Sequence, residues 1–330
     1  MNDFASGPLR LGLLSTASIN RMILGGARPS EHVEVVAVAS RDGAKALAYA
    51  SEYGIPSSHG SYEALLEDPG VDALYVSLPN GLHHEWTMRA LEAGKHVLCE
   101  KPYSRHPPEV EEAFATAAGR GLVLMEAFMY RHHPQTQRVQ ELVERGAVGR
   151  LRLIRSTFSF PLGDLGNVRA RPELDGGSLM DVGCYCVSGA RLLAGEPERV
   201  LGEAVLGSTG VDMAFHATMR HADGVVSQFD CSFSLPLRQE LEVLGEEGIL
   251  QVAAPWRVDW GGPVTLRRGD GVEEVAVGEA DAYRLELENL SAAVRGDAEP
   301  RLGRDDALGQ ARTIEALYRA AETGRAVAPD

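Results

Sequence analysis

The sequence predicts an α/β protein, in which an N-terminal Rossmann-type, doubly wound parallel sheet is followed by a C-terminal α+β domain built on a large, open, mostly antiparallel sheet. Two patterns lead to this prediction. Up to residue 126, short apolar runs alternate with helical segments of roughly 10–15 residues, which indicates a parallel sheet. From residue 127, closely spaced runs alternate apolar and polar residues, as half-buried antiparallel strands do. We therefore expect one domain over residues 1–126 and a second over 127–330.

Composition and charge limit the classes of protein that fit this chain. Its 330 residues, 44% hydrophobic and 24% charged, are typical of a globular protein with room for two domains. A formal net charge of −15 argues against nucleic acid or an anionic membrane as a partner. No apolar run would span a membrane, the N-terminus does not read as a signal peptide, and four cysteines do not make a disulfide framework. We expect a cytoplasmic protein, and no metal site, because Cys184 and Cys186 lack a nearby set of ligands.

The expected elements follow from the apolar runs and the turn residues between them. Parallel strands are predicted at residues 9–14, 33–39, 73–78, 96–99 and 122–125. Helices are predicted between them at 21–28, 44–53, 62–67, 108–120 and in a segment that runs on to 93. After a helix that ends near 146, a half-buried antiparallel strand is predicted at 150–160, and further strands at 199–206, 211–221, 225–234, 239–244 and 248–254. The remaining helices are predicted at 178–194, 283–295 and 305–323. The last two can pack against the first domain, although they follow the second domain in the sequence.

The turn after the first strand consists mainly of small residues. It contains Ser15, Thr16, Ala17, Ser18 and Ile19. Small residues allow backbone N–H groups to approach a pyrophosphate at a helix N-terminus, so this turn is a candidate phosphate-binding turn. The usual Gly-x-Gly-x-x-Gly is replaced here by Ser-x-Ala-x-x-Asn, so the turn alone does not decide whether a nucleotide binds.

The end of the second strand bears on the kind of nucleotide. A dinucleotide fold usually places a carboxylate near this position to hold the ribose 2′-hydroxyl. Here Ser40 and Arg41 directly follow the strand, ahead of Asp42. An arginine suits a 2′-phosphate, which it can bind through two charge-assisted hydrogen bonds. The pair favours NADP, while Asp42 keeps NAD open. The alternative is a solvated loop arginine.

Polar residues also follow the third and fourth strands. Around the end of the third strand lie Leu78, Pro79, Asn80 and, three residues on, His83. The fourth strand, in His-Val-Leu-Cys-Glu-Lys-Pro, ends in Glu100 and Lys101 before Pro102, which restricts the backbone of the lysine. Ligands of open α/β sheets bind at the carboxyl ends of the strands, so Glu100 and Lys101 are expected at the rim of a cleft. A surface lysine after a strand is the alternative.

A second group of candidate residues lies at 176–185. Gly176 and Gly177 allow close approach of the backbone to a neighbour, and Asp181 and Tyr185 are four residues apart on the expected helix, hence on one face. With Lys101 they form a set that can move the hydroxyl proton of an alcohol during hydride transfer. The lysine and tyrosine pKa values both lie near 10, so catalysis at pH 7 requires a shift of about 3 units, or roughly 4 kcal/mol. The alternative is a helix N-terminal charge and a core tyrosine.

Three motifs together carry a family resemblance. Glu100-Lys101-Pro102, Pro79-Asn80-x-x-His83 and Gly176-Gly177-Ser-Leu-Met-Asp181-x-Gly183-x-Tyr185 resemble the glucose–fructose oxidoreductase/inositol dehydrogenase/MocA family over nearly the whole chain. The resemblance implies a dinucleotide-binding Rossmann domain, a second domain for substrate and oligomerisation, and NAD(P)-dependent chemistry on a sugar, polyol or diol. It also implies a homodimer or homotetramer packed through the open sheet face. At the position of Tyr185, inositol-dehydrogenase-like members have histidine. With a tyrosine there, the chain is more similar to the branch that contains dihydrodiol dehydrogenase and NADP-dependent xylose dehydrogenase.

The resemblance gives each candidate residue an expected role. The cofactor-binding residues are Ser15, Thr16, Ala17, Ser18, Ile19, Ser40, Arg41, Leu78, Pro79, Asn80, His83, Glu100 and Lys101. The catalytic residues are Lys101, Asp181 and Tyr185, and the substrate-binding residues are Arg131, Arg169, Asp181 and Tyr185. We expect an NADP-preferring dehydrogenase or reductase of CH–OH groups, with Tyr185 as the acid/base and Lys101 polarising the reacting oxygen; the reverse assignment stays open. A biosynthetic keto-sugar reductase and a non-catalytic dinucleotide-sensing regulator remain as alternatives.

Overall fold

The computed structural model describes residues 7–330 and divides into two compact units. Unit 1 comprises the chain up to Ser104 together with Pro108–His132 and Asp281–Ala307. Unit 2 comprises Arg105–Pro107, His133–Ala280 and Leu308–Asp330. Within residues 7–330, no helix is long and apolar enough to cross a membrane.

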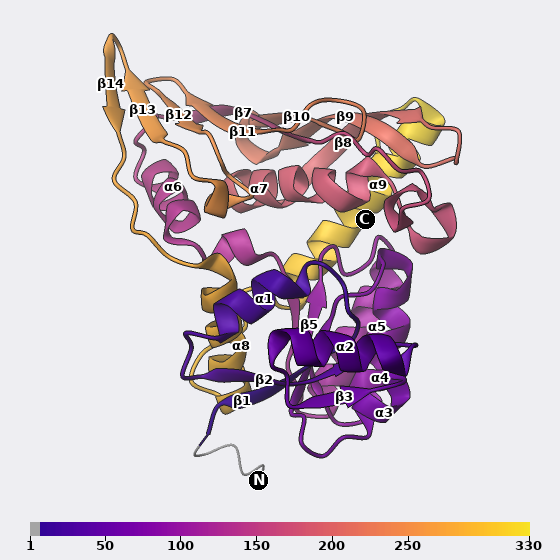
Figure 1. Ribbon diagram of the computed structural model, residues 1–330. Helices are drawn as coiled ribbons and strands as arrows, with labels where there is room; N and C mark the ends of the chain where they lie inside the picture. Colours follow the sequence, from indigo (N-terminus) through magenta and orange to yellow (C-terminus); the bar gives the residue numbers. More distant parts are fainter. Residues whose placement is uncertain (1–6) are drawn as a thin grey trace. The chain divides into compact units, whose positions relative to one another are not determined.

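Unit 1 is built on six parallel strands in the order β3-β2-β1-β4-β5-β6 (Figure 1). The strands are β1 (Leu9–Leu13), β2 (Val33–Ala39), β3 (Ser57–His59), β4 (Ala73–Val76), β5 (His96–Glu100) and β6 (Leu124–Ala127). This order is that of a Rossmann fold, in which the winding reverses between β1 and β4. The predicted fold class is therefore confirmed for the first half of the chain.

Helices connect the strands of unit 1. They are α1 (Asn20–Ala27), α2 (Gly43–Tyr53), α3 (Tyr62–Leu66), α4 (His83–Glu92) and α5 (Pro107–Gly119), with α8 (Ala282–Arg295) joining from the end of the chain. The short helices η1 (Asn80–Leu82) and η2 (Met129–His132) precede α4 and follow β6. α8 packs against α1, η2 and β2. Strand β4 is buried along its whole length, as a central strand covered on both faces must be.

Unit 2 is built on an eight-stranded sheet in the order β14-β13-β12-β11-β7-β10-β9-β8. The strands are β7 (Leu151–Ser159), β8 (Pro197–Leu206), β9 (Asp212–His221), β10 (Val226–Ser232), β11 (Arg238–Gly245), β12 (Ile249–Val252), β13 (Val264–Arg268) and β14 (Gly271–Glu274). All neighbouring pairs are antiparallel except β7 and β10, which run parallel. The prediction of a large, mostly antiparallel sheet is confirmed.

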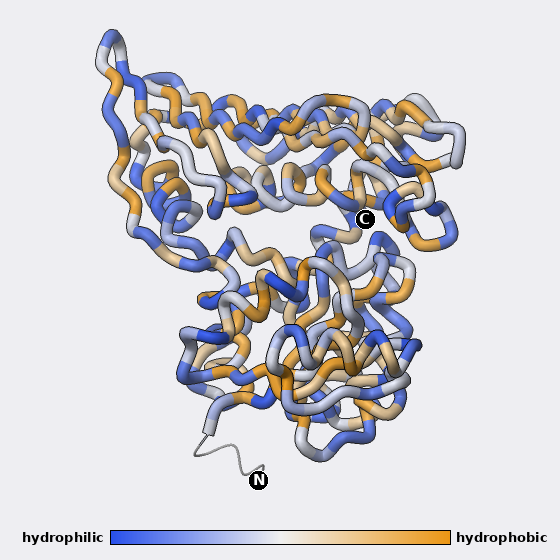
Figure 2. The backbone as a smooth tube through the Cα atoms, viewed as in Figure 1, coloured by the Kyte–Doolittle hydropathy of each residue, from blue (hydrophilic) through white to orange (hydrophobic). Residues whose placement is uncertain are grey.

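Helices lie along one face of this sheet, and its other face is open (Figure 1). The helices are α6 (Pro134–Glu144), α7 (Cys184–Ala194) and the part of α9 (Arg304–Thr323) that belongs to unit 2. Hydrophobic and hydrophilic residues alternate along the strands in Figure 2, since one face packs on helices and the other does not. The short helices η3 (Val168–Ala170), η4 (Pro172–Leu174), η6 (Ala222–Gly224) and η7 (Val258–Trp260) lie in the connections.

The structure corrects some predicted elements. The helix predicted at 178–194 begins with a π-helical segment, η5 (Leu179–Gly183), before α7. The strand predicted at 122–125 is β6, two residues further along the chain. The strand predicted at 150–160 pairs antiparallel with β11 but parallel with β10. Strands β3, β13 and β14 were not predicted, because their sequences lack long apolar runs.

Candidate functional site

The turn between β1 and α1 is held by side chains where the usual motif has glycines. The Ser15 hydroxyl lies 2.8 Å from the Ser77 hydroxyl and accepts a hydrogen bond of 3.0 Å from the amide of Ala17. The side-chain amide of Asn20 donates to the carbonyl of Ser15 at 2.8 Å. These bonds tie the turn to itself and to the end of β4, so Ser15 and Asn20 fix a shape that glycines would leave flexible.

The helix that follows this turn suits an anionic ligand. No side chain caps the N-terminus of α1, and its first turn carries no acidic residue. Thr16, Ala17 and Ile19 are half-buried and Ser18 is exposed, so the turn is accessible. The amides of Asn20, Arg21 and Met22 already donate to carbonyls of the turn, so it is the helix dipole beside an accessible turn that favours phosphate at this position.

Asp42 has a structural role that the sequence left open. Its carboxylate caps α2 by accepting hydrogen bonds from the amides of Ala44 and Lys45, at 2.9 and 3.2 Å. The amide of Asp42 in turn donates to the hydroxyl of buried Ser40 at 3.2 Å. Arg41 between them is exposed. The carboxylate that would favour NAD therefore binds the start of the helix, while the side chain of exposed Arg41 lies near the hydroxyl of Tyr62.

The residues present fit NADP. The groups that they offer are the positive end of the α1 helix dipole, beside the accessible turn 16–19, and the guanidinium of Arg41, an exposed residue. Both are groups that bind phosphate oxygens, and they follow the first and second strands of the same parallel sheet.

The backbone around Lys101 is held at three points. The amide of Lys101 donates to Glu100 at 3.2 Å, and the amide of Tyr103 donates to buried Glu126 at 2.7 Å. The carbonyl of Pro102, which follows Lys101 through a cis peptide bond, lies 3.0 Å from Nδ1 of His83. The side chain of Lys101 is half-buried. This bracing fixes the base of the lysine at the carboxyl end of β5.

His83 bridges two strand ends. Its Nε2 lies 2.8 Å from the carbonyl of Leu78, just after β4, and its Nδ1 lies near Pro102, just after β5. The imidazole is fully buried, and burial lowers its pKa. Both ring nitrogens face backbone, so His83 acts on the loops that carry Pro79, Asn80 and Lys101. Pro79 and Asn80 themselves are half-buried.

A buried acidic cluster lies behind the lysine. The hydroxyl of Tyr75 in β4 donates to Oε1 of Glu100, whose Oε2 accepts from the amide of Lys101. Glu286 of α8 is buried, and its Oε1 has no hydrogen-bond partner. Burial, and then the negative charge of Glu100, raise the pKa of Glu286 well above its usual value. The raised pKa favours the neutral form of Glu286, because a like charge nearby disfavours ionisation of a second buried carboxyl group.

In unit 2, the structure joins two of the predicted substrate residues. Nε of Arg169 donates to Asp181 at 2.6 Å. Gly176 and Gly177 lie against the backbone of this arginine, and the amide of Gly177 donates to the Arg169 carbonyl at 2.9 Å. A Cβ on Gly176 would overlap that carbonyl, which explains the glycine. The close approach expected of the two glycines is thus observed.

Tyr185 lies in an aromatic cluster at the start of α7. Its ring contacts Phe158 of β7 edge-on, with centroids 5.5 Å apart, and Trp256 at 6.2 Å. The Trp256 indole is fully buried and donates to the carbonyl of Thr157 at 3.1 Å. The phenol ring of Tyr185 is therefore oriented by rings that the sheet itself holds.

The predicted site residues fall into both units. Lys101 and the cofactor-binding candidates belong to unit 1, and Asp181, Tyr185 and Arg169 belong to unit 2. Arg131 belongs to unit 1, where its guanidinium lies 3.3 Å from Asp306. Its role toward a substrate remains a prediction. Within residues 7–330, no group of His, Cys, Asp and Glu is arranged to hold a metal ion.

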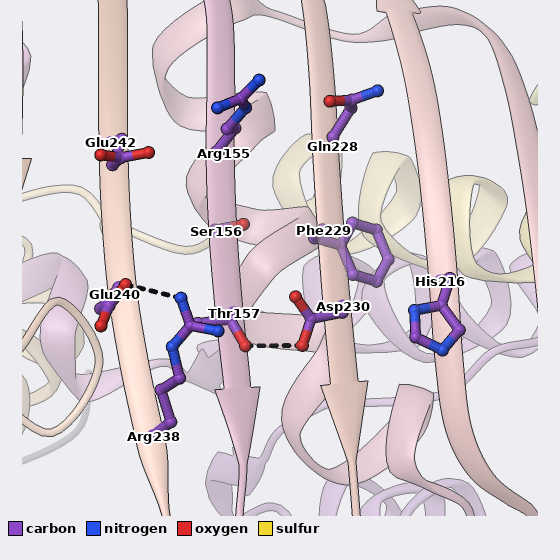
Figure 3. Close-up of a pocket in the computed structure, with 10 residues that line it drawn as sticks. All are labelled: Arg155, Ser156, Thr157, His216, Gln228, Phe229, Asp230, Arg238, Glu240 and Glu242. Atoms are coloured by element: carbon purple, nitrogen blue, oxygen red, sulfur yellow. Dashed lines mark hydrogen bonds and ion pairs between the residues drawn. The ribbon is translucent and has the colours of Figure 1, made fainter. Parts of the chain in front are cut away.

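A concave region lies on the open face of the eight-stranded sheet (Figure 3). Across β11, β7, β10 and β9, the residues that pair in register form a polar row: Glu240, Thr157, Asp230 and His216. The Thr157 hydroxyl donates to Asp230 at 2.8 Å, and Arg238 donates to Glu240 at 2.8 Å. Neither Tyr185 nor Asp181 lines this region.

Sequence reasoning missed several residues that support the site. Glu126 and Glu286 could have been suspected, since each is a carboxylate among apolar neighbours of a strand or of a helix face. Asp212, which contacts the start of η5, could not, because it begins a strand far along the chain.

The comparisons with known proteins agree with this architecture. Residues 16–128 match the model described as "Oxidoreductase family, NAD-binding Rossmann fold", and residues 136–251 match the GFO/IDH/MocA C-terminal domain. The chain is 40% identical to D-xylose 1-dehydrogenase (NADP(+)) 2 of Haloferax volcanii, over 98% of this chain and 100% of that protein. It is 35% identical to trans-1,2-dihydrobenzene-1,2-diol dehydrogenase of Mus musculus, over 75% of each chain.

A solved structure with the same fold is that of KijD10, a 3-ketoreductase from Actinomadura kijaniata in complex with NADP and TDP-benzene. Its TM-score is 0.90 and its identity 32%, over 95% of this chain and 98% of that one. The domain matches and the full-length similarity to the xylose dehydrogenase establish the relationship: this chain belongs to the GFO/IDH/MocA family of oxidoreductases.

Proposed function

We propose that this protein transfers hydride between NADP(H) and a secondary or anomeric alcohol, or the corresponding carbonyl, of a sugar, polyol or cyclic diol. The observation that carries the proposal is the braced lysine at the end of β5, in a chain 40% identical to an NADP-dependent xylose dehydrogenase over its full length. When bound, the nicotinamide supplies or accepts the hydride. The side chains of this chain position the substrate and move the proton.

In the oxidation direction, the C–H bond of the alcohol breaks and its electron pair leaves with the hydride. The O–H proton must pass to a base at the same time, and the C=O bond forms. The phenolate of Tyr185 is the proposed proton acceptor and becomes the phenol, while the ammonium of Lys101 stabilises the negative charge that develops on the reacting oxygen. In the reverse assignment, the neutral amine of Lys101 takes the proton and becomes the ammonium, and the Tyr185 phenol donates a hydrogen bond. Asp181, paired with Arg169, orients the substrate hydroxyls.

Replacing Lys101 by Met tests the proposal. We expect kcat to fall to background while NADP still binds with a Kd within a few-fold of wild type, since the phosphate contacts come from other residues. Absorbance at the reduced-nicotinamide band measures turnover, and titration calorimetry measures binding. Lys45→Met, at an exposed position on α2, is the matched control and should keep full activity. Full activity in Lys101→Met would contradict the proposal.

The direction of the reaction has a second candidate. The similarity to a 3-ketoreductase favours reduction of a keto-sugar, which uses the same residues with the proton moving from Tyr185 to the substrate oxygen. A panel of aldoses, inositols, aromatic dihydrodiols and nucleotide-linked keto-sugars, assayed with both cofactor forms, separates the two. Binding of NADP without turnover on any of them would indicate a cofactor-sensing regulator instead.

The protein is proposed to form a homodimer or homotetramer through the open face of the sheet. The polar row on that face contains acids beside a histidine, and Arg155 and Arg238 line the same region, so the surface can complement a second copy of itself. A cytoplasmic location suits the four cysteines, all of which are buried thiols rather than disulfides.

A further inference from the structure

A buried carboxylate anchors the start of the helix that carries Tyr185. Oδ2 of Asp212, the first residue of β9, accepts hydrogen bonds from the hydroxyl of Ser178 and the amide of Leu179, both at 2.7 Å. Its Oδ1 accepts from the hydroxyl of Tyr318 in α9 at 2.9 Å. The side chain is almost wholly enclosed. One carboxylate therefore connects a strand, the first turn of η5 and a distant helix.

The glycine before this turn is explained by the same carboxylate. Gly177 has a φ of +125°, and a Cβ there would overlap Oδ1 of Asp212 and lie 3.2 Å from the Tyr318 hydroxyl. A side chain at 177 would displace the anchor and strain the backbone. The second glycine of the motif is thus required by Asp212, as the first is required by the Arg169 carbonyl.

The anchored turn leads directly to the proposed catalytic groups. The amide of Asp181 donates to the carbonyl of Gly177 at 3.0 Å, and the π-helical segment ends where the amide of Cys184 donates to Leu179. Gly183 faces Cys231 of β10, where a Cβ would lie 2.7 Å from its sulfur. Asp181 lies two residues and Tyr185 six residues beyond Leu179, so a shift of this turn moves both side chains.

We propose that Asp212 is a positioning residue for the reaction, which holds η5 and the start of α7 so that Asp181 and Tyr185 keep the orientation that proton transfer requires. The proposal rests on the function proposed above. Asp212 does not touch the substrate: all three of its donors are groups of this chain. Misplacement of an acid/base by about 1 Å can lower the rate roughly 100-fold, so loss of the anchor should appear in kcat.

The test compares Asp212→Ala with Asp212→Asn. Asparagine can keep its oxygen toward Ser178 and Leu179 and donate its amide to the Tyr318 hydroxyl, so we expect its kcat within a few-fold of wild type. Alanine removes all three bonds, and we expect kcat to fall roughly 100-fold with the Kd for NADP unchanged. Glu322→Ala, an exposed carboxylate on the same α9, is the control and should leave kcat unchanged. If the alanine variant does not fold, Tyr318→Phe provides the test. It removes a single hydrogen bond to Asp212, and we expect a loss of kcat between those of the asparagine and alanine variants.

Hydrogen exchange separates this inference from the proposed function. In Asp212→Ala, the amides of 178–185 should exchange faster than in wild type, while those of β5 do not change. If residues 178–185 exchange faster in Asp212→Ala but the wild-type protein turns over no substrate, the anchoring role of Asp212 is retained and the enzymatic role is rejected. Unchanged kcat in a folded Asp212→Ala variant would overturn the inference. An equal loss of kcat and NADP affinity would overturn it as well, since it would indicate general damage.

Discussion

Arg41 is the residue on which the choice between NADP and NAD depends. Oδ1 of Asp42 caps α2, which gives this carboxylate a structural role in the helix. We expect Arg41→Ser to raise the Kd for NADP by roughly 10- to 100-fold, because a charge-assisted contact to a phosphate contributes about 1.5–3 kcal/mol. The Kd for NAD, which lacks the 2′-phosphate, should not change. Calorimetric titration with both cofactors measures this.

The control for Arg41 is Arg120→Ser, at an exposed position at the end of α5. It should leave both dissociation constants unchanged. A wild-type enzyme that prefers NAD by about 100-fold, or about 2.7 kcal/mol, would contradict the role of Arg41.

Glu286 should make stability depend on pH. Burial and the charge of Glu100 raise its folded-state pKa above the unfolded value near 4.3. Its contribution to stability is therefore full below the unfolded pKa and is lost as the pH rises toward the folded pKa. Gln cannot ionise, so Glu286→Gln should gain stability relative to wild type as the pH increases, by at most about 1.4 kcal/mol per pH unit.

Urea unfolding at about pH 5 and about pH 8 measures this difference. The matched control is Glu92→Gln, at an exposed position of α4, whose effect on the free energy of unfolding should be small and similar at both pH values. If Glu286→Gln loses stability relative to wild type as the pH rises, then Glu286 is ionised in the folded protein and the inference that its neutral form is favoured is wrong.

At the scale of elements, α1 packs on α8 at Gly26 but not at the adjacent Gly25, so the two glycines should respond oppositely to alanine. A Cβ on Gly26 would lie 2.7 Å from the amide nitrogen of Arg284 and 2.9 Å from the carbonyl carbon of Tyr283, whereas a Cβ on Gly25 would meet no atom within 4 Å. We expect Gly26→Ala to destabilise the protein by about 1–3 kcal/mol through overpacking. Gly25→Ala should stabilise it by up to about 1 kcal/mol, since alanine favours the helix. Urea unfolding distinguishes them, and equal effects would contradict the close packing.

Helices and strands that contain clear apolar runs could be predicted from the sequence. The strands around Lys101 and Arg41 were predicted because Val97–Cys99 is apolar, 33–39 is apolar apart from Glu34, and both runs are followed by polar residues. Strands β13 and β14 were missed because they lie at one edge of the open sheet, and β14 is exposed along its length. The π-helical segment η5 was missed because no local pattern in the sequence distinguishes it from the α-helix that follows, while the contacts around it, such as that of Gly183 with Cys231, join residues that are distant in the sequence.

The candidate site was predictable where one residue type implied its chemistry. Lys101 and Tyr185 were predicted as site residues because their positions match a family motif and because their side chains can move a proton, and their roles stay predictions. Asp212 was not identifiable, because it bonds Tyr318 from 106 positions away. Glu286 could be suspected as a carboxylate on an apolar helix face, but its approach to Glu100 from a helix at the far end of the chain could not. Such contacts follow from the tertiary fold and leave no local pattern.

At the scale of the whole molecule, the open sheet face is the feature that calls for an explanation. A broad sheet face with rows of paired polar side chains is unlike the apolar face that packs on α7, yet no helix in residues 7–330 covers it (Figures 1 and 3). An isologous interface juxtaposes the same patch from two copies, so it requires a surface that contains both signs of charge. Asp230, Glu240, Arg155 and Arg238 supply both.

Charge reversal at the centre of this face tests the assembly. We expect wild-type protein to sediment as a dimer or tetramer, and Asp230→Arg to dissociate it, because the substitution removes the acceptor of the Thr157 hydroxyl and places like charges against each other across the interface. Analytical ultracentrifugation at micromolar concentration measures the mass. Glu322→Arg, an equal change of charge on exposed α9, is the control and should leave the mass unchanged. A monomeric wild type, or an Asp230→Arg variant of undiminished mass, would show that this face does not join the copies.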